Sequence, residues 1–456
     1  MILVTGGLGF LGSHIALNLL AQGQEVIIVD NLSNSNLQIL ERLEYISGMY
    51  VPFVKIDIRN TPALNKVFEQ YSIRAVVHAA GFKSLEESVL KPLEYYNDNV
   101  SCIMSLMRAM QRTGVRNLVN LSSLAVYGQS SADLKEDMPF HYAYPNPYVK
   151  SQQMVEEIIR DTARTDNEWK IAILRLSNIA GAFEHGVLGE FIAPLPKNIV
   201  PLAMQVGALQ REFIELRKQA NTADHTAERS FLHVLDACKA VLLALNWLDT
   251  QEHTCEAFNI SGELISIQKL LDLIAEVTYS PIKTIDAPYY PYAEFDQLGS
   301  HSEKAKEILN WAPEHSLKKT LEDEVTSLKG ALKFKEEEKK QKEKEKYHKD
   351  IKTFEDTKEI LDELKSTISE LEDALESIDK VDENYEEISH AYDELKVELK
   401  KLEDELELQE EELEKTKEFI EDNTIEQEYE EVNSQYKEFE NEYENIKQSF
   451  YNLILL

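Results

Sequence analysis

The first fourteen residues restrict the fold more than any other part of the chain. An apolar run, Ile2 to Thr5, is followed at once by glycines spaced three apart, Gly6, Gly9 and Gly12, and then by a helical pattern. Such glycines permit a tight turn, close approach of the backbone to a pyrophosphate, and close packing of helix on strand. The order of strand, glycine loop and helix predicts the first unit of a dinucleotide-binding fold.

A carboxylate at the end of the second apolar run supports this prediction. Asp30 closes the run Val26–Asp30, about 18 residues after the glycine loop. A carboxylate at this place accepts hydrogen bonds from the adenosine ribose hydroxyls and disfavours a 2′-phosphate. The predicted cofactor is therefore NAD rather than NADP.

Apolar runs alternate with helical patterns up to about residue 180, which predicts an α/β fold with a doubly wound parallel sheet. We expect a Rossmann domain over residues 1–180. Over residues 181–330 the strand signal thins, which indicates a smaller substrate-binding domain, with segments near 230–260 returning to the first domain. Ligands bind at the carboxyl ends of such strands. The predicted strands are Ile2–Thr5, Val26–Asp30, Phe53–Asp57, Ala75–His78, Leu118–Leu121 and Ile171–Leu174.

The composition changes abruptly after Gly330. Residues 331–456 contain no proline or glycine and carry roughly two thirds of the formal net charge of −34. Apolar residues recur there at 3,4 spacing, which predicts an acidic, all-α coiled-coil tail in two segments, with a stammer between Ile378 and Val381 and a break at 422–424. A hairpin is one arrangement. For Lys333–Lys349 a single solvated helix is the alternative. The apolar positions are Leu361, Leu364, Ile368, Leu371, Leu375 and Ile378, then Val381, Tyr385, Ile388, Tyr392, Leu395, Leu399, Leu402 and Leu406, and finally Tyr429, Val432, Tyr436, Phe439, Tyr443, Ile446, Phe450 and Leu453.

Charge and composition argue against several classes of partner. The acidic balance disfavours binding to nucleic acid or to an anionic membrane surface. The chain begins in a predicted strand and contains no run of 18 apolar residues, so we expect a cytoplasmic protein. Its three cysteines lack CxxC spacing, and we expect reduced core thiols and no metal site.

Longer sequence motifs occur along the chain, and the first of them contains the glycine loop. They comprise Thr5–His14, Asp30–Ser35, Val77–Lys83 with Glu87–Val89 and Asn99, Leu121–Gly128, Asn146–Ser151, Pro196–Pro201, and Arg229 with Phe231–Val234. Together they resemble the UDP-glucose 4-epimerase family of extended short-chain dehydrogenases/reductases, over residues 1 to about 325. The resemblance implies a UDP-hexose substrate, tightly bound NAD and a transient 4-keto sugar.

The resemblance also implies roles for individual residues. Tyr148 would take the proton of the sugar hydroxyl, and Ser123 would hydrogen-bond to that hydroxyl. Asn178, Asn198 and Arg229 would hold the diphosphate, although a turn role is the alternative for the two asparagines. Asp57 and Ile58 would lie near adenine, and Lys83 and Asn99 on the nicotinamide side. The implied cofactor-binding residues are Gly6, Gly9, Phe10, Leu11, Gly12, Asp30, Asn31, Asn34, Asp57, Ile58, Ala79, Ala80, Gly81, Lys83 and Asn99.

The chain departs from the family at the position four residues after the tyrosine, where members carry a lysine and this chain has Gln152. A cation about 4 to 6 Å from the phenol, at an effective dielectric near 20, is worth on the order of 3 to 4 kcal/mol, or roughly two pKa units. Lys150 cannot replace it, because a shift of two residues points to another face of the helix. The family's arginines near 287–296 are also missing, and Tyr289–Tyr292 stand there instead.

Three hypotheses follow. The chain is an active 4-epimerase slowed by Gln152, or an inactive homologue that serves as an NAD-binding structural module for the coiled coil, or a related dehydratase or reductase. A dehydratase is disfavoured because Leu124-Ala125 offers no acidic pair after Ser123. We also expect a homo-oligomer, a dimer or larger, formed through helices around 101–111 and 152–159, through the coiled coil, or with an unknown protein partner.

Overall fold

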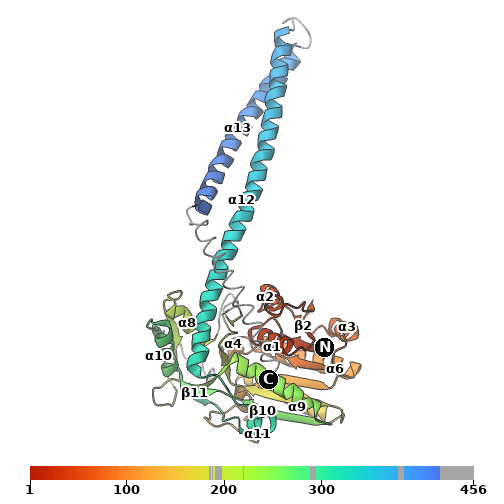
Figure 1. Cartoon of the computed structure of the whole chain (residues 1–456), viewed down its shortest axis with the longest axis vertical. Coiled ribbons are helices and arrows are strands. Elements are labelled where there is room, and N and C mark those ends of the chain that lie inside the picture. The colour runs from red at the N-terminus through yellow and green to blue at the C-terminus, as the bar shows by residue number, and fades with distance from the viewer. Residues whose placement is uncertain are drawn as a thin grey trace. The chain divides into compact units, whose positions relative to one another are not determined.

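The computed structural model describes residues 1–183, 186, 188–190, 198–218, 220–287, 294–377 and 385–421. The chain divides into two compact units, Met1–Ala331 and Leu332–Leu456. Figure 1 labels several helices and strands of the two units.

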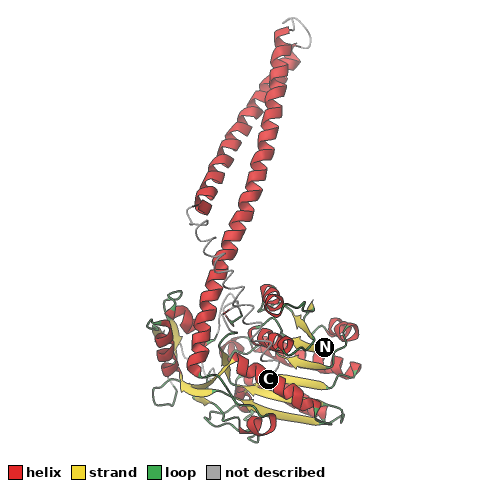
Figure 2. Cartoon of the chain, viewed as in Figure 1, coloured by secondary structure: helices red, strands yellow, loops and turns green. Residues whose placement is uncertain are grey.

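A seven-stranded sheet forms the centre of the first unit (Figure 2). Its strand order is β3-β2-β1-β4-β5-β6-β10, and all neighbouring strands are parallel. The predicted doubly wound parallel sheet is confirmed, and its order reverses between β1 and β4. The strands are β1 (Ile2–Thr5), β2 (Val26–Asp30), β3 (Phe53–Lys55), β4 (Ala75–His78), β5 (Asn117–Ser123), β6 (Lys170–Leu176) and β10 (Thr254–Ile260).

Helices cover both faces of this sheet, because its strands are apolar on both sides. One core contains side chains of α1 (Phe10–Ala21), α2 (Gln38–Ser47), α9 (Val234–Asp249) and α11 (Glu303–Leu309). The other contains side chains of α3 (Thr61–Gln70), α6 (Ser101–Thr113) and α7 (Pro147–Ala163). Short helical elements follow β4 and β5, namely α4 (Leu85–Leu90), α5 (Pro92–Tyr95), the π-helix η1 (Tyr96–Val100) and the 3₁₀-helix η2 (Leu124–Tyr127).

The rest of the first unit has two small sheets and a core of its own. One sheet contains β7 (Asn178–Ala180), β9 (Glu228–His233), β11 (Glu263–Ser266) and β13 (Gln297–Leu298), and the other pairs β8 (Ile214–Leu216) with β12 (Thr284–Asp286). Helices α8 (Ile199–Gly207) and α10 (Ile267–Thr278) pack over them. Leu317, Leu321 and Leu328 complete this core, so the first turns of α12 (Leu317–Ser377) belong to the first unit.

The described part of the second unit is a helical hairpin of α12 and α13 (Tyr385–Glu421). Lys365 pairs with Glu403 at 3.1 Å and Lys396 with Glu372 at 3.4 Å, so the helices run antiparallel. The sequence predicted a stammer between these two stretches of helix and no change of direction. The predicted break at 422–424 and the apolar pattern after it lie outside the described residues, as do Ile378 and Val381.

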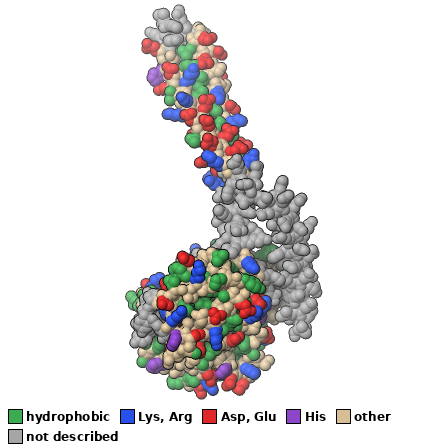
Figure 3. Space-filling model, turned by 90° about the vertical axis from the view of Figure 1, so that its left-hand side faces the viewer, with side chains coloured by type: hydrophobic (Ala, Val, Ile, Leu, Met, Phe, Trp, Pro, Cys, Tyr) green, Lys and Arg blue, Asp and Glu red, His purple; other side chains and the backbone are tan. Residues whose placement is uncertain are grey.

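The hairpin seam follows the predicted apolar positions. Leu361 and Ile368 are buried, whereas acidic and basic side chains are interspersed on the face of the hairpin seen in Figure 3. Among the described residues, neither these helices nor any others combine the length and apolar character needed to cross a bilayer.

Candidate active site

The glycine loop packs directly on the loop after β4. A Cβ atom on Gly6 would lie 2.8 Å from the Cα atom of Ala80, and one on Gly12 would lie 2.1 Å from the carbonyl oxygen of Gly6. Helix α1 begins at Phe10, and its N-cap, Gly9, makes no side-chain hydrogen bond to the helix. The first-turn amides therefore stay available to an anion. This cradle fits the pyrophosphate of NAD.

Asp30 holds the glycine loop from the end of β2. Its Oδ2 atom accepts a hydrogen bond from the Leu8 amide at 3.1 Å, and its Oδ1 atom accepts bonds from the Leu32 amide at 2.9 Å and the Ser35 hydroxyl at 2.8 Å. The carboxylate is thus fixed beside the cradle, where the sequence predicts contact with ribose.

The residues predicted near adenosine gather at the ends of β2 and β3. The Asn31 amide donates to Asp57 Oδ2 at 3.4 Å, and Asn34 is exposed in the loop after β2. Hydrogen bonds from Arg59 lower the pKa of Asp57 to about 2, so Asp57 remains an acceptor. The side chain of Ile58 lies in the core, and only its backbone is left to face a ligand.

Asn99 holds the loop Ala79–Lys83 against α7. Its side-chain amide donates to the Phe82 carbonyl at 3.1 Å and to Ser151 Oγ at 2.9 Å, and its carbonyl accepts from the Phe82 amide at 2.8 Å. A Cβ atom on Gly81 would lie 3.0 Å from Asn99 Oδ1. These bonds fix the backbone next to Lys83.

A buried carboxylate that the sequence did not indicate connects the cofactor and substrate sides. Lys83 Nζ lies 3.7 Å from Glu190 Oε1, and the Asn198 amide donates to the same oxygen. Burial raises the pKa of Glu190, and Lys83 lowers it. Glu190 stands in a loop without periodic pattern, so no sequence signal marks it. Asn178 is exposed at the start of β7.

The predicted catalytic pair comes together between β5 and α7. Ser123 ends β5, and Tyr148 lies in the first turn of α7. This helix begins at Pro147 because Asn146 caps it, accepting a hydrogen bond from the Val149 amide at 3.2 Å. The Ser123 hydroxyl lies near enough to the Tyr148 hydroxyl to lower the pKa of the phenol.

The surroundings of Tyr148 oppose its ionisation. Its ring is 7% exposed and meets the edge of Tyr95, with centroids 6.3 Å apart. Burial raises the pKa of Tyr148 above its ordinary value, and the neighbouring Ser123 hydroxyl lowers it by less. No cation among the described residues lowers it further. Gln152 is buried one turn later, and its amide makes no hydrogen bond to another described residue.

A buried ion pair fixes the elements that carry this pair. Arg175 on β6 donates from Nη2 to Glu156 of α7 at 2.7 Å, and Ser122 of β5 donates to Glu156 at 2.7 Å. Arg175 also donates to the Tyr127 hydroxyl at 2.7 Å. The carboxylate therefore ties β5, β6 and α7 together directly behind Ser123.

Arg229 lies on β9, buried among acceptors. Its Nη2 atom donates to the Phe295 carbonyl at 2.6 Å and lies 3.4 Å from Glu294 Oε1. Burial lowers its pKa. The neighbouring Tyr289–Tyr292 segment, where the family's arginines are missing, lies outside the described residues.

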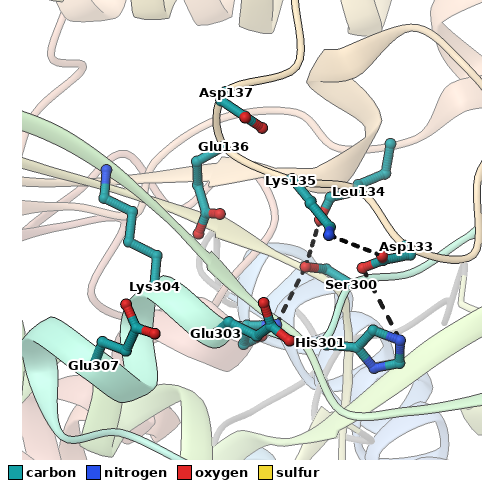
Figure 4. A pocket seen from close by; sticks show the side chains of 11 residues that line it. Asp133, Leu134, Lys135, Glu136, Asp137, Ser300, His301, Glu303, Lys304 and Glu307 are labelled. Atoms are coloured by element: carbon teal, nitrogen blue, oxygen red, sulfur yellow. Dashed lines mark hydrogen bonds and ion pairs between the residues drawn. The ribbon is translucent and has the colours of Figure 1, made fainter.

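A separate cavity of about 380 Å³ is lined by none of the predicted site residues (Figure 4). Ser300 donates to the Leu134 carbonyl at 2.7 Å, and Lys135 pairs with Asp133 at 3.5 Å. The first contact joins two loops of the fold, and the second lies within one of them. The lining residues are Asp133, Leu134, Lys135, Glu136, Asp137, Ser300, His301, Ser302, Glu303, Lys304 and Glu307.

Comparison with known proteins agrees with this arrangement. The NAD dependent epimerase/dehydratase family matches residues 2–261. UDP-glucose 4-epimerase 2 of Arabidopsis thaliana is 34% identical over 328 residues, which cover 71% of this chain and 93% of that protein. The chain belongs to the UDP-glucose 4-epimerase family. The UDP-glucose 4-epimerase of Bacillus subtilis is 33% identical, over 71% of this chain and 95% of that protein.

Solved structures of the family have the same fold. The UDP-glucose 4-epimerase of Bifidobacterium longum, in complex with NAD+ and UDP, matches with a TM-score of 0.69 and 30% identity, over 72% of this chain and 98% of that one. The enzyme of Stenotrophomonas maltophila, with bound NAD and formylated UDP-arabinopyranose, matches with a TM-score of 0.68 and 30% identity, over 73% of this chain and 98% of that one. The prediction of an NAD-dependent family is confirmed.

Proposed function

We propose that this chain interconverts UDP-hexoses at C4 with NAD held at the glycine loop. The observation that carries this proposal is that Tyr148, in the first turn of α7, lies beside Ser123 at the carboxyl end of β5. Tyr148 also packs in one cluster with Phe82, which directly precedes Lys83. NAD, when bound, supplies the acceptor for the hydride of C4 and returns it to the other face of the 4-keto sugar.

In this proposal Tyr148 accepts the proton of the C4 hydroxyl, while Ser123 orients that hydroxyl and shares its proton. The bonds of Glu156 hold both side chains in position. Because burial raises the pKa of Tyr148 and Gln152 brings no charge, we infer that the proton transfer is slow at neutral pH and faster in alkaline solution.

Conversion of UDP-galactose to UDP-glucose by the purified chain tests the proposal, beside Tyr148→Phe and Ser123→Ala. We expect conversion that Tyr148→Phe abolishes and Ser123→Ala reduces by roughly 10- to 1000-fold. Conversion that survives in Tyr148→Phe would assign the base to another residue.

A second function is favoured by the same surroundings of Tyr148. A buried phenol without a nearby cation is poorly suited to act as a base, so the chain would then be an NAD-binding module that carries the hairpin. Bound NAD in the absence of conversion at any pH distinguishes this function from the first.

For the tail we propose a role in assembly, because an epimerase domain needs no hairpin for its chemistry. The described seam is filled within one chain by the pairing of α12 with α13. Light scattering of the full chain and of a chain ending at Ala331 measures whether self-association depends on residues 332–456. If the full chain and the shortened chain form oligomers with the same number of copies, the role in assembly is contradicted.

A further inference from the structure

Two arginines and two glutamates form one cluster in the first unit, which we call the Arg-Glu cluster: Glu86, Arg217, Arg229 and Glu294. Arg217 Nη2 donates to Glu86 Oε2 at 2.6 Å, and Arg229 Nη2 lies 3.4 Å from Glu294 Oε1. The two pairs lie in neighbouring segments, because the backbone amide of Asn221, four residues after Arg217, donates to Asp296 Oδ1 at 3.1 Å, and Asp296 lies two residues after Glu294. In keeping with this, Arg229 and Arg217 both lower the pKa of Glu294 against the larger effect of burial.

The cluster connects the two sides of the candidate active site. Glu86 lies in α4, whose N-cap, Ser84, directly follows Lys83. Arg217 directly follows β8, and Arg229 lies on β9. The sequence contains no arginine after Arg229, so a second guanidinium beside it has to come from earlier in the chain.

We propose that Arg217 joins Arg229, to which the resemblance gives this role, in binding the diphosphate of the nucleotide sugar. Glu86 and Glu294 are then the carboxylates that pair with these arginines when no nucleotide is bound. The inference rests on the proposed function. Two guanidinium groups match the two negative charges of a diphosphate diester, and their planar forks suit phosphate oxygens.

The exposed fractions of the Arg217 and Glu86 side chains are consistent with the replacement of the Glu86 carboxylate by a phosphate group. The Arg217 side chain is 21% exposed, whereas its partner Glu86 is 41% exposed. Glu86 can therefore turn into water at little cost, while Arg217 keeps its place. A phosphate oxygen replaces a carboxylate oxygen, so the guanidinium keeps its charge-assisted hydrogen bond.

A purely structural role for the ion pair between Arg217 and Glu86 leads to a different prediction. If the ion pair only holds these elements together, Arg217→Gln and Glu86→Gln remove the same bond and have the same effect. If Arg217 binds phosphate, Glu86→Gln removes a competitor and leaves the affinity for UDP unchanged or higher.

The test is calorimetric titration of the full chain with UDP, and ligand-observed NMR with uridine, which lacks phosphate. We expect Arg217→Gln to weaken UDP binding by roughly 10- to 100-fold and to leave uridine binding unchanged. Arg217→Lys, which keeps the charge but not the fork, should lose less. Arg211→Gln, at an exposed position six residues earlier, is the matched control and should bind UDP like the parent.

Equal losses in Arg217→Gln and Glu86→Gln, or equal losses for UDP and uridine, would overturn the inference. UDP binding that Arg217→Gln leaves unchanged also overturns it, while the proposed function stands. A parent chain that does not bind UDP at all overturns both.

Discussion

Gln152→Lys is the substitution whose effect follows most directly from the site. Gln152 lies one helical turn after Tyr148, so a lysine there brings an ammonium to about 4 to 6 Å from the phenol. At an effective dielectric near 20 this stabilises the phenolate by on the order of 3 to 4 kcal/mol, which lowers the pKa of Tyr148 by roughly two units. Glu156, one turn further on and already charge-paired with Arg175, offers the new cation an anionic neighbour.

If Tyr148 is the base, the rate at pH 7 is proportional to its phenolate fraction. We therefore expect Gln152→Lys to raise that rate by roughly 100-fold and to shift the alkaline rise of the pH profile down by about two units. Initial rates of UDP-galactose conversion between about pH 6.5 and 9.5 measure both effects.

Two variants separate charge from shape in this experiment. Gln152→Met keeps the length of the side chain without charge, and Lys150→Gln removes the nearby lysine that points to another face of α7. Neither should move the profile. An equal gain from Gln152→Met, or a gain from Gln152→Lys that is the same at every pH, would refute the electrostatic reasoning.

Three further predictions concern stability. Glu156→Gln leaves Arg175 as an uncompensated buried charge, so urea unfolding should give a free energy of unfolding lower by about 3 to 5 kcal/mol; a change below about 1 kcal/mol would contradict the buried pair. A chain ending at Ala331 keeps the first turns of α12 in its core, so we expect a soluble, NAD-binding protein by gel filtration and absorbance, and aggregation would be the contrary result. Burial lowers the pKa of His14 and of His78 to about 4; their contribution to stability is complete above about pH 6.5 and is lost as pH falls toward about 4, by up to about 3 kcal/mol each. Thermal melts should decline across this window and less so in His78→Gln, and a flat dependence would refute neutral burial.

The parallel sheet could be predicted because its strands are short apolar runs, each followed by a helical pattern. The apolar run at β3 was predicted to reach Asp57, but the strand ends at Lys55. The Asp57 carboxylate instead accepts a hydrogen bond from the Arg59 amide in the turn that follows. Strand β10 was not predicted as such: residues 254–260 are far along the chain from β6, and only tertiary pairing makes them the edge of the sheet.

The positions of Ser123 and Tyr148 could be predicted because their motifs resemble a strand end and a helix start of the family; their catalytic roles stay a prediction. Glu190 and Glu294 could not be predicted, because each stands in a loop and becomes significant only through what packs against it. In the tail, the slip in the apolar pattern between Ile378 and Val381 predicted overwinding of a continuing helix. The ion pairs between α12 and α13 instead show that these helices run in opposite directions.

The most direct test of the account is conversion of UDP-galactose and UDP-N-acetylgalactosamine by the unmodified full chain, from neutral to alkaline pH, with the bound NAD quantified in the same preparation. The account predicts slow conversion of at least one sugar at pH 7 that accelerates as pH rises. Protein that contains NAD and converts neither sugar at any pH would contradict it, and would make the chain an NAD-binding module for its helical hairpin.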